Sequence, residues 1–299
     1  MPRKFIYFIN PISGTGEKEL LVQTISTRTS AQNIPYEIAA TNVEGNYDYL
    51  KQKIQTEAIT DVIVCGGDGT VNKIANALKG LNVCIGIIPM GSGNGLALAA
   101  GIPTNADKAL QIIFDGHAAF TDGFYINQQF SCMLCGLGFD AQVAHDFAQQ
   151  PKRGLITYAK QTVKNFFSAK PYPFIIKANG EEISRDAFFI SIANSNQFGN
   201  NVTIAPKASI CDGLLDVVVV TKMSKLKLLF AVARQIFRGQ VTTTRSEFKK
   251  KDIVYLQTKH LQIDNLQHAP LHIDGDPAST AARFNVEIVE NAFKLLQPA

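Results

Sequence analysis

The first 120 residues alternate short apolar runs with longer helical stretches. The apolar runs are KFIYFIN (4–10), YEIAAT (36–41), DVIVC (61–65) and VCIGIIP (83–89). The helical stretches that follow them are residues 17–32, 45–57, 71–78 and a segment from about Leu96. This alternation is typical of a parallel sheet with helices on both faces. Ligands bind such sheets at the carboxyl ends of the strands, where this chain has loops rich in Gly, Ser, Thr and Asn.

From about Phe120 onward the pattern changes to many runs of strand length separated by turn signals. They cover residues 122–127, 130–134, 174–179, 187–194, 214–220, 252–257, 260–264, 269–275 and 283–289. Asn179-Gly180 predicts a hairpin turn, and two helical stretches, 155–167 and 225–238, interrupt the strands. We therefore expect an α/β domain over residues 1–120 and a mostly antiparallel β-sandwich over 121–290. The last residues, about 291–299, are expected to pack back onto the first domain.

Composition and charge narrow the class of protein. The chain has 299 residues, of which 46% are hydrophobic and 18% charged, so it has enough apolar material for sizeable cores. The 29 Lys and Arg exceed the 25 Asp and Glu by four, too few for a dedicated nucleic-acid binder. This charge leaves room for anionic substrates or a membrane surface. The start, MPRKFIYFINP, is too short an apolar stretch for a secretory signal, and a cytoplasmic protein without a membrane span is expected.

Cysteine and histidine spacing gives no metal site. The five cysteines are scattered, as expected for reduced thiols. Cys132 and Cys135 form a CxxC inside an apolar run, with no second Cys or His pair to complete a zinc site, so a core strand is favoured. His272 alternates with Ile273 in a predicted strand, which indicates a solvent-facing or a satisfied side chain.

The segment VIVCGGDGTVN (62–72) carries the most chemical information. A buried strand runs directly into two glycines and then a helix, and glycines let backbone amides approach a bound anion. Asp68, at the apex of the turn, would face the phosphates, where a carboxylate is costly unless it holds a metal or takes a proton. The alternative is a plain glycine-rich turn between strand and helix.

Two further loops follow the same design. IGIIPMGSGNG (85–95) comes after the next strand, and NPISGTG (10–16) comes after the first. Glycine-rich loops at neighbouring strand ends would line one crevice, which suits the phosphate chain of a nucleotide. The sequences match neither GxxxxGK[ST] nor GxGxxG, so a P-loop or a Rossmann NAD site is not supported.

Together these loops resemble the diacylglycerol kinase catalytic-domain family, which includes bacterial lipid kinases and the sphingosine and ceramide kinases. The resemblance spans nearly the whole chain in order. The matching motifs are NPISG (10–14), Thr41, GGDGTVN (66–72), PMGSGNGLA (89–97), GLGFDA (136–141), CDGLLDV (211–217) and IDGD (273–276). GGDGT is shared with NAD kinases and phosphofructokinase-like folds, whereas CDGLLDV and IDGD point to the lipid-kinase branch.

The resemblance implies an ATP-binding N-terminal domain, a lipid-binding C-terminal domain and an active site in the cleft between them. The expected ATP contacts are Asn10, Thr41, Gly66, Gly67, Asp68, Gly69, Thr70, Val71, Asn72, Ser92 and Asn94. Asp68 would act where phosphate and hydroxyl meet, and Asp276 would take the proton from the lipid hydroxyl.

The family also implies a lipid head-group residue and a structural magnesium. Asp140 falls at the head-group position, the alternative being a cap for a helix that begins at Ala141. The magnesium ligands would be Asp212 with the carbonyls of Ser209 and Leu214, the alternative being a simple Asp-Gly turn.

Two positions depart from the family pattern. Lys73 stands where the family has Glu after GGDGTxN, and Asp276 replaces the Glu of DGE with a side chain one methylene shorter. Asp274, in the same turn, is an alternative carboxylate. The basic, apolar stretch 222–238 either lies on an anionic membrane or packs on its own domain.

The leading hypothesis is an ATP- and Mg²⁺-dependent lipid kinase that phosphorylates the hydroxyl of diacylglycerol or a related lipid alcohol. Its partner would be lipid at a membrane surface that this cytoplasmic protein visits transiently, without nucleic acid, and a homodimer is possible. One alternative is a catalytically weak or inactive binder of nucleotide and lipid, motivated by Lys73 and Asp276. Another is a soluble-substrate kinase such as an NAD kinase, motivated by GGDGT alone.

Overall fold

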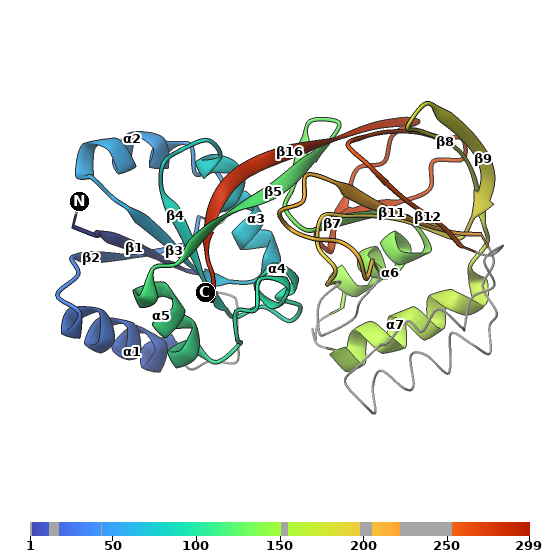
Figure 1. The fold of residues 1–299 in the computed structure, drawn as a ribbon. Helices are drawn as coiled ribbons and strands as arrows, with labels where there is room; N and C mark the ends of the chain where they lie inside the picture. Colours follow the sequence, from blue (N-terminus) through green and yellow to red (C-terminus); the bar gives the residue numbers. More distant parts are fainter. Residues whose placement is uncertain (1, 12–17, 43, 151–154, 198–204, 222–252) are drawn as a thin grey trace. The chain divides into compact units, whose positions relative to one another are not determined.

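The computed structural model describes residues 2–11, 18–42, 44–150, 155–197, 205–221 and 253–299 (Figure 1). The chain divides into two compact units. Unit 1 comprises Met1–Asp122 with Glu290–Ala299, and unit 2 comprises Gly123–Val289.

Unit 1 is a parallel sheet in the order β2-β1-β3-β4, with the end of β16 beside β4. Its strands are β1 (Phe5–Ile9), β2 (Tyr36–Ala40), β3 (Asp61–Gly66), β4 (Cys84–Pro89) and the last part of β16 (Arg283–Leu296). Its helices are α1 (Lys18–Ala31), α2 (Tyr49–Glu57), α3 (Asp68–Leu78), α4 (Gly95–Ala99) and α5 (Ala106–Asp115). Figure 1 shows α2 and α3 on one face of the sheet and α1 and α5 on the other.

The apolar runs explain this layout. Every residue of β1 and β3 is buried, as is expected of strands covered on both faces. Because the four strands are parallel, their carboxyl ends and the loops that follow lie at one edge of the sheet. The predicted α/β class is confirmed.

Unit 2 contains two sheets. One has six strands in the order β12-β11-β10-β7-β14-β15, and the other combines β5, β6, β8, β9, β13 and the first part of β16. The bounds are β5 (Ala118–Ile126), β6 (Gln129–Ser131), β7 (Leu134–Gly138), β8 (Tyr172–Ala178), β9 (Glu181–Ala187), β10 (Phe189–Ala193), β11 (Leu215–Val220), β12 (Ile253–Thr258), β13 (His260–Asn265), β14 (Leu271–Ile273) and β15 (Asp276–Ala278). The strand pairs among the described residues of unit 2 are antiparallel, as in β10 with β11 and β13 with β8.

One hydrophobic core joins the two sheets of unit 2, with Leu137 and Ile192 from one sheet and Phe174 and Phe284 from the other. The predicted antiparallel sandwich is therefore confirmed. Cys135 belongs to this core, and Cys132 is also fully buried, so the CxxC is a core feature of free thiols.

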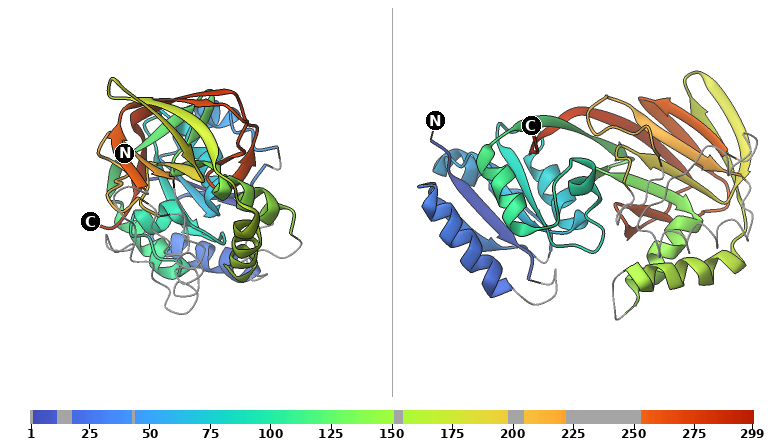
Figure 2. Two further views of the ribbon diagram at one scale, coloured as in Figure 1. Left: turned by 90° about the vertical axis from the view of Figure 1, so that its right-hand side faces the viewer. Right: turned by 60° about the horizontal axis from the view of Figure 1, so that its bottom comes forward.

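Local signals account for the connections in unit 2. Asn179 and Gly180 both have positive φ, 53° and 79°, and they connect β8 to β9 as the predicted hairpin turn. Two helices, α6 (Phe139–Ala148) and α7 (Leu155–Ser168), pack against each other (Figure 2). The helix α6 also contacts β7, β14 and β15. The predicted helix 225–238 lies outside the described residues.

Candidate functional site

The loops after β3 and β4 touch at two glycines. A Cβ built on Gly91 would lie 2.5 Å from the Cα of Gly67 and 2.9 Å from Oδ1 of Asn94. A Cβ on Gly67 would lie 3.0 Å from the Cα of Gly91. The two backbones can approach this closely because neither residue has a side chain. The structure thus brings the GGDGT and GSGNG loops together at the carboxyl edge of the sheet.

Asp68 begins α3, and its carboxylate is directed at the neighbouring loop. Its Oδ1 accepts a hydrogen bond from the backbone N–H of Leu96 at 3.4 Å. Burial raises the pKa of the Asp68 carboxyl, and hydrogen bonds from the N–H groups of Gly95, Leu96 and Asn94 oppose that rise. The carboxylate therefore fastens the start of α3 to the start of α4.

Asn94 fixes the shape of the second loop. It has a left-handed backbone, with φ of 53°, its Oδ1 accepts from the N–H of Gly91 at 2.8 Å, and its Nδ2 donates to the carbonyl of Gly91 at 2.8 Å. These two hydrogen bonds close a small ring between Gly91 and Asn94, and Ser92, which lies between them in sequence, is exposed. Asn94 is only 8% exposed, so its side chain shapes the loop, and its predicted contact with ATP stays a prediction.

The loop after β1 is anchored to α3. Nδ2 of Asn10 donates to Oγ1 of Thr70 at 3.0 Å, and the N–H of Asn10 donates to the carbonyl of Cys65 at 3.0 Å. Thr41 follows β2, where its N–H donates to the carbonyl of Ile9 at 3.0 Å. Asn10, Thr41 and Thr70 therefore share the edge of the sheet that carries the glycine loops.

The start of α3 is suited to an anion. The helix is 11 residues long, and Gly67 precedes it in an extended conformation, so its first N–H groups and its dipole favour a negative group. Lys73, one turn further along, is exposed and packs against Gly45, because a Cβ on Gly45 would lie 2.8 Å from the Lys73 Nζ. Lys73 thereby contacts the loop after β2.

The carboxylates of the IDGD turn have opposite environments. Asp274 is 8% exposed and its Oδ1 accepts from Oγ of Ser131 at 2.6 Å and from the N–H groups of Met133 and Leu134 at 3.2 and 3.0 Å. Asp276, two residues later, is exposed at the start of β15. Asp274 holds the turn in place, whereas Asp276 is accessible to a substrate.

Asp140 pairs with a histidine that the sequence did not connect to it. Its Oδ1 accepts from the N–H of Ala141 at 2.8 Å, and its Oδ2 lies 3.4 Å from Nε2 of His272. The helix begins at Phe139 with Gly138 as its N-cap, so the alternative that Asp140 caps a helix starting at Ala141 is wrong. His272 is fully buried, which settles its two predicted alternatives in favour of a satisfied side chain.

The predicted magnesium loop forms a turn that begins at Asp212. Oδ1 of Asp212 accepts from the N–H of Leu214 at 3.1 Å, and Gly213 between them has a φ of 70°. The Asp-Gly turn is therefore observed. Asp212 is exposed and Ser209 partly so, and a carboxylate with nearby carbonyls is a donor set that fits a hard cation. Among the described residues no group of three or more His, Cys, Asp or Glu could hold a metal.

Asp216 lies beyond this turn, fully buried in β11. Burial raises the pKa of its carboxyl, hydrogen bonds from Tyr255 and Gln257 oppose the rise, and the charge of Asp212 adds to it. Asp216 and Asp212 are thus electrostatically coupled.

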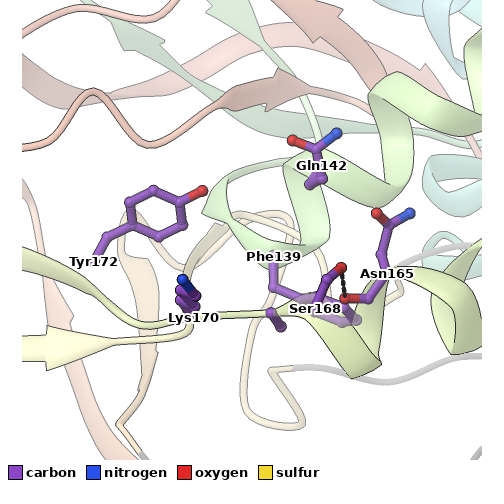
Figure 3. A pocket seen from close by; sticks show the side chains of 7 residues that line it. Phe139, Gln142, Asn165, Ser168, Lys170 and Tyr172 are labelled. Atoms are coloured by element: carbon purple, nitrogen blue, oxygen red, sulfur yellow. Dashed lines mark hydrogen bonds between the residues drawn. The ribbon is translucent and has the colours of Figure 1, made fainter.

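A hollow of about 340 Å³ lies beside the start of α6 in unit 2 (Figure 3). Its lining comes from α6, α7, the connection between α7 and β8, and the start of β8, and it includes Phe139, Gln142, Asn165, Ser168, Lys170 and Tyr172. Phe139 directly precedes Asp140, and the rest of the lining is mostly polar. The hollow is separate from the residues that the sequence predicted as sites.

Comparison with known proteins identifies the family. Residues 4–124 match the model of the diacylglycerol kinase catalytic domain, and residues 134–297 match the model of the YegS C-terminal NAD kinase beta sandwich-like domain. The chain therefore belongs to the YegS-like branch of the diacylglycerol kinase catalytic-domain family, which is a family of kinases.

Individual relatives support this assignment. A protein of Yersinia enterocolitica, named a probable YegS-like lipid kinase, is 30% identical over 249 residues, 81% of this chain and 80% of that one. A Yersinia pestis protein of the same name is 27% identical over 306 residues, covering 100% and 98%. A solved structure titled a diacylglycerol kinase from Bacillus anthracis aligns with a TM-score of 0.75 at 20% identity, over 99% of this chain and 97% of that one. At this identity the structure supports the fold alone.

Proposed function

We propose that the protein is an ATP-dependent lipid kinase that transfers the γ-phosphoryl group to the hydroxyl of diacylglycerol or a related lipid alcohol. The observation that carries the proposal is the contact between the Gly67 and Gly91 loops at the carboxyl edge of a parallel sheet. Family membership supports the same chemistry. Substrate, site residues and metal are part of the proposal.

ATP binds through its phosphates in this proposal. The N–H groups at the start of α3 and of the glycine loops donate to phosphate oxygens, and Asn10 and Thr70, already joined by a hydrogen bond, border that position. Asp68 keeps the two loops in register through the N–H of Leu96. Because phosphoryl transfer depends mainly on positioning and electrostatics, such a rigid cradle supplies much of what catalysis needs.

The transfer itself uses one accessible carboxylate. Asp276 accepts the proton as the lipid hydroxyl oxygen forms its bond to the γ-phosphorus, and the bond from phosphorus to the bridging oxygen breaks to release ADP. The exposure of Asp276 supports this role, whereas Asp274 is buried among hydrogen-bond donors.

Mg²⁺ is assigned two places. Bound with ATP it would neutralise phosphate charge, and a structural ion would be held by Asp212 with the carbonyls of Ser209 and Leu214. We expect Mg²⁺ to raise the unfolding temperature of the wild type in the absence of ATP and to raise that of Asp212→Ala much less. An equal rise in both proteins would contradict the structural site.

The substrate is expected at a membrane surface. No helix among the described residues is long and apolar enough to cross a bilayer. In this proposal the enzyme reaches its lipid by contact with the membrane surface. The basic stretch 222–238, which was predicted to serve this contact or to pack on its own domain, lies outside the described residues.

Incubation of the purified protein with γ-labelled ATP and a lipid panel tests the proposal. The panel contains diacylglycerol, ceramide, sphingosine and glycerol-headgroup phospholipids in mixed micelles, with NAD in a parallel reaction. Label in a lipid supports the proposal, and label in NAD alone supports the soluble-substrate alternative. If folded protein that binds ATP labels no compound, a binding protein is the better description.

A further inference from the structure

A buried carboxylate and a buried imidazole face each other in unit 2. The side chain of His272 is 0% exposed and that of Asp140 8% exposed, and Nε2 of the first lies 3.4 Å from Oδ2 of the second. They come from different elements, β14 and α6, and lie 132 residues apart in sequence. A buried polar pair of this kind is costly unless its hydrogen bonds are satisfied.

The other nitrogen of His272 is also engaged. Nδ1 lies 3.3 Å from the N–H of Gly275, and because an amide only donates, Nδ1 is the acceptor. The proton of the neutral ring is then on Nε2, where it points at Asp140. The imidazole therefore connects the first turn of α6 to the backbone of the Asp274-Gly275 turn.

The adjacent strand leaves room for this pair. Gly136 in β7 is the register partner of His272, and a Cβ built on Gly136 would overlap both the Asp140 carboxylate and Nε2 of His272. Glycine at position 136 is thus required by the pair itself, which indicates a built arrangement.

The Asp274-Gly275 turn is the part of the chain that presents Asp276. Both turn residues have left-handed backbones, with φ of 49° and 85°, in a two-residue hairpin loop that pairs Ile273 with Asp276. Asp274 is fastened on one side by Ser131 and the β6–β7 backbone. On the other side, His272 holds the N–H of Gly275.

We propose that Asp140 and His272 are positioning residues, which fix the 274–276 turn and through it the carboxylate of Asp276. This role rests on the proposed kinase function, because in that reaction Asp276 accepts the proton of the lipid hydroxyl. Because both side chains are buried, the proposal gives them no direct contact with a substrate. Asp140 orients the imidazole, and the imidazole orients the turn. In this proposal Asp140 therefore acts on Asp276 through His272, and not by binding the lipid head group.

Two substitutions of His272 separate its two hydrogen bonds. In His272→Asn the side-chain oxygen occupies the place of Nδ1 and keeps an acceptor for Gly275. In His272→Gln the side-chain nitrogen occupies the place of Nε2 and keeps a donor for Asp140. The proposal predicts that His272→Leu lowers kcat by about 10-fold to 100-fold, the range that a displacement on the order of 1 Å produces. His272→Asn should lose less kcat than His272→Gln.

The test combines four measurements on the full chain. Amide hydrogen exchange of Gly275 and the ¹⁵N shifts of the His272 ring are followed by NMR, lipid phosphorylation gives kcat, and calorimetry gives the Kd for ATP. The expected result is faster Gly275 exchange and lower kcat in His272→Leu, with an unchanged Kd for ATP. His260→Leu, which removes an exposed histidine of the same unit, serves as the matched control and should change none of these.

Each outcome is decisive. Unchanged Gly275 exchange in His272→Leu, or faster exchange with unchanged kcat, overturns the proposal, as does a greater loss in His272→Asn than in His272→Gln. If the 272 variants do not fold, Asp140→Asn keeps the side-chain volume and should still speed Gly275 exchange and lower kcat. If the wild type labels no lipid, the proposed function fails, and Gly275 exchange and the ring shifts decide the positioning of the turn alone.

Discussion

Gly91→Ala tests whether the contact between the two glycine loops makes the nucleotide site. The added Cβ would lie 2.5 Å from the Cα of Gly67, whereas ordinary contacts begin at 3.4 Å, so the loops have to separate by about 0.9 Å. Gly67 cannot yield cheaply, because it is the N-cap of α3 and its carbonyl accepts from Thr70 and Val71. The new methyl also meets Oδ1 of Asn94 at 2.9 Å, which disturbs the ring that shapes the second loop.

The size of the effect follows from these distances. Forcing one methyl into a packed contact costs about 1–3 kcal/mol of stability. A displacement on the order of 1 Å in groups that position a phosphate can cost up to about 100-fold in rate. We expect Gly91→Ala to weaken ATP binding by at least about 10-fold while the protein remains folded.

Gly80→Ala is the matched control for this prediction. Gly80 also lies in unit 1, at a positive φ of 75°, but a Cβ there would have no atom within 4 Å. Its substitution costs roughly 1–2 kcal/mol through backbone strain alone and leaves the loops in place. Calorimetric titration with ATP and thermal unfolding are run on both variants. Equal ATP affinity in Gly91→Ala and wild type would refute the reasoning, as would an equal loss in both variants.

Three further predictions concern accessible and buried polar groups. Asp276→Ala should lower kcat by about 100-fold or more. It should not lower the unfolding temperature, since the side chain is exposed, and Asp276→Glu should restore activity. Retained kcat in the alanine variant would exclude a general base at this position. Arg3→Ala should lower the free energy of unfolding in urea by roughly 3 kcal/mol, because the carboxylate of Asp61, a residue that is 2% exposed, loses the guanidinium that contacts both its oxygens. Arg283→Ala, which removes the exposed ion pair with Asp264, should lower it by less than about 1 kcal/mol. Equal costs would contradict this. Cys211 is exposed and should react first with a maleimide, because burial raises the pKa of the strand thiols and keeps them protonated; mass spectrometry of the folded protein that finds a strand cysteine labelled as fast as Cys211 would contradict it.

Much of the fold was predictable because its signals are local. The runs that became β1, β3 and β4 are continuous and apolar, and such strands need cover on both faces. The hairpin at Asn179-Gly180 follows from the left-handed conformations that these two residues tolerate. The helix α5 was missed although its signals were present, with Asn105 as N-cap, Gly116 as a left-handed C-cap and a buried apolar face between them.

For the candidate site, the sequence could predict which loops lie together, because each loop follows a strand of known direction, but not how the side chains are oriented. Placing GGDGT and GSGNG at one edge needs nothing beyond parallel strands, whereas the direction of a side chain depends on tertiary packing. Asp68 accepts a hydrogen bond from the N–H of Leu96, a contact that the sequence did not indicate, and its role at the phosphates stays a prediction. The partnership of Asp140 with His272 was not visible, because no local pattern joins residues 132 positions apart. The sequence offered one signal, a histidine (His272) in a predicted strand. The structure shows why it can point inward, because its partner on the neighbouring strand β7 is Gly136.

The most direct test of the central claim compares lipid phosphorylation by the wild type and Asp276→Ala, using γ-labelled ATP and the lipid panel, with ATP affinity measured on the same samples. We expect the wild type to label at least one lipid alcohol, and Asp276→Ala to bind ATP equally well but to label that lipid at least about 100-fold more slowly. Folded, ATP-binding wild type that labels no lipid would contradict the account, and so would equal labelling by the two proteins.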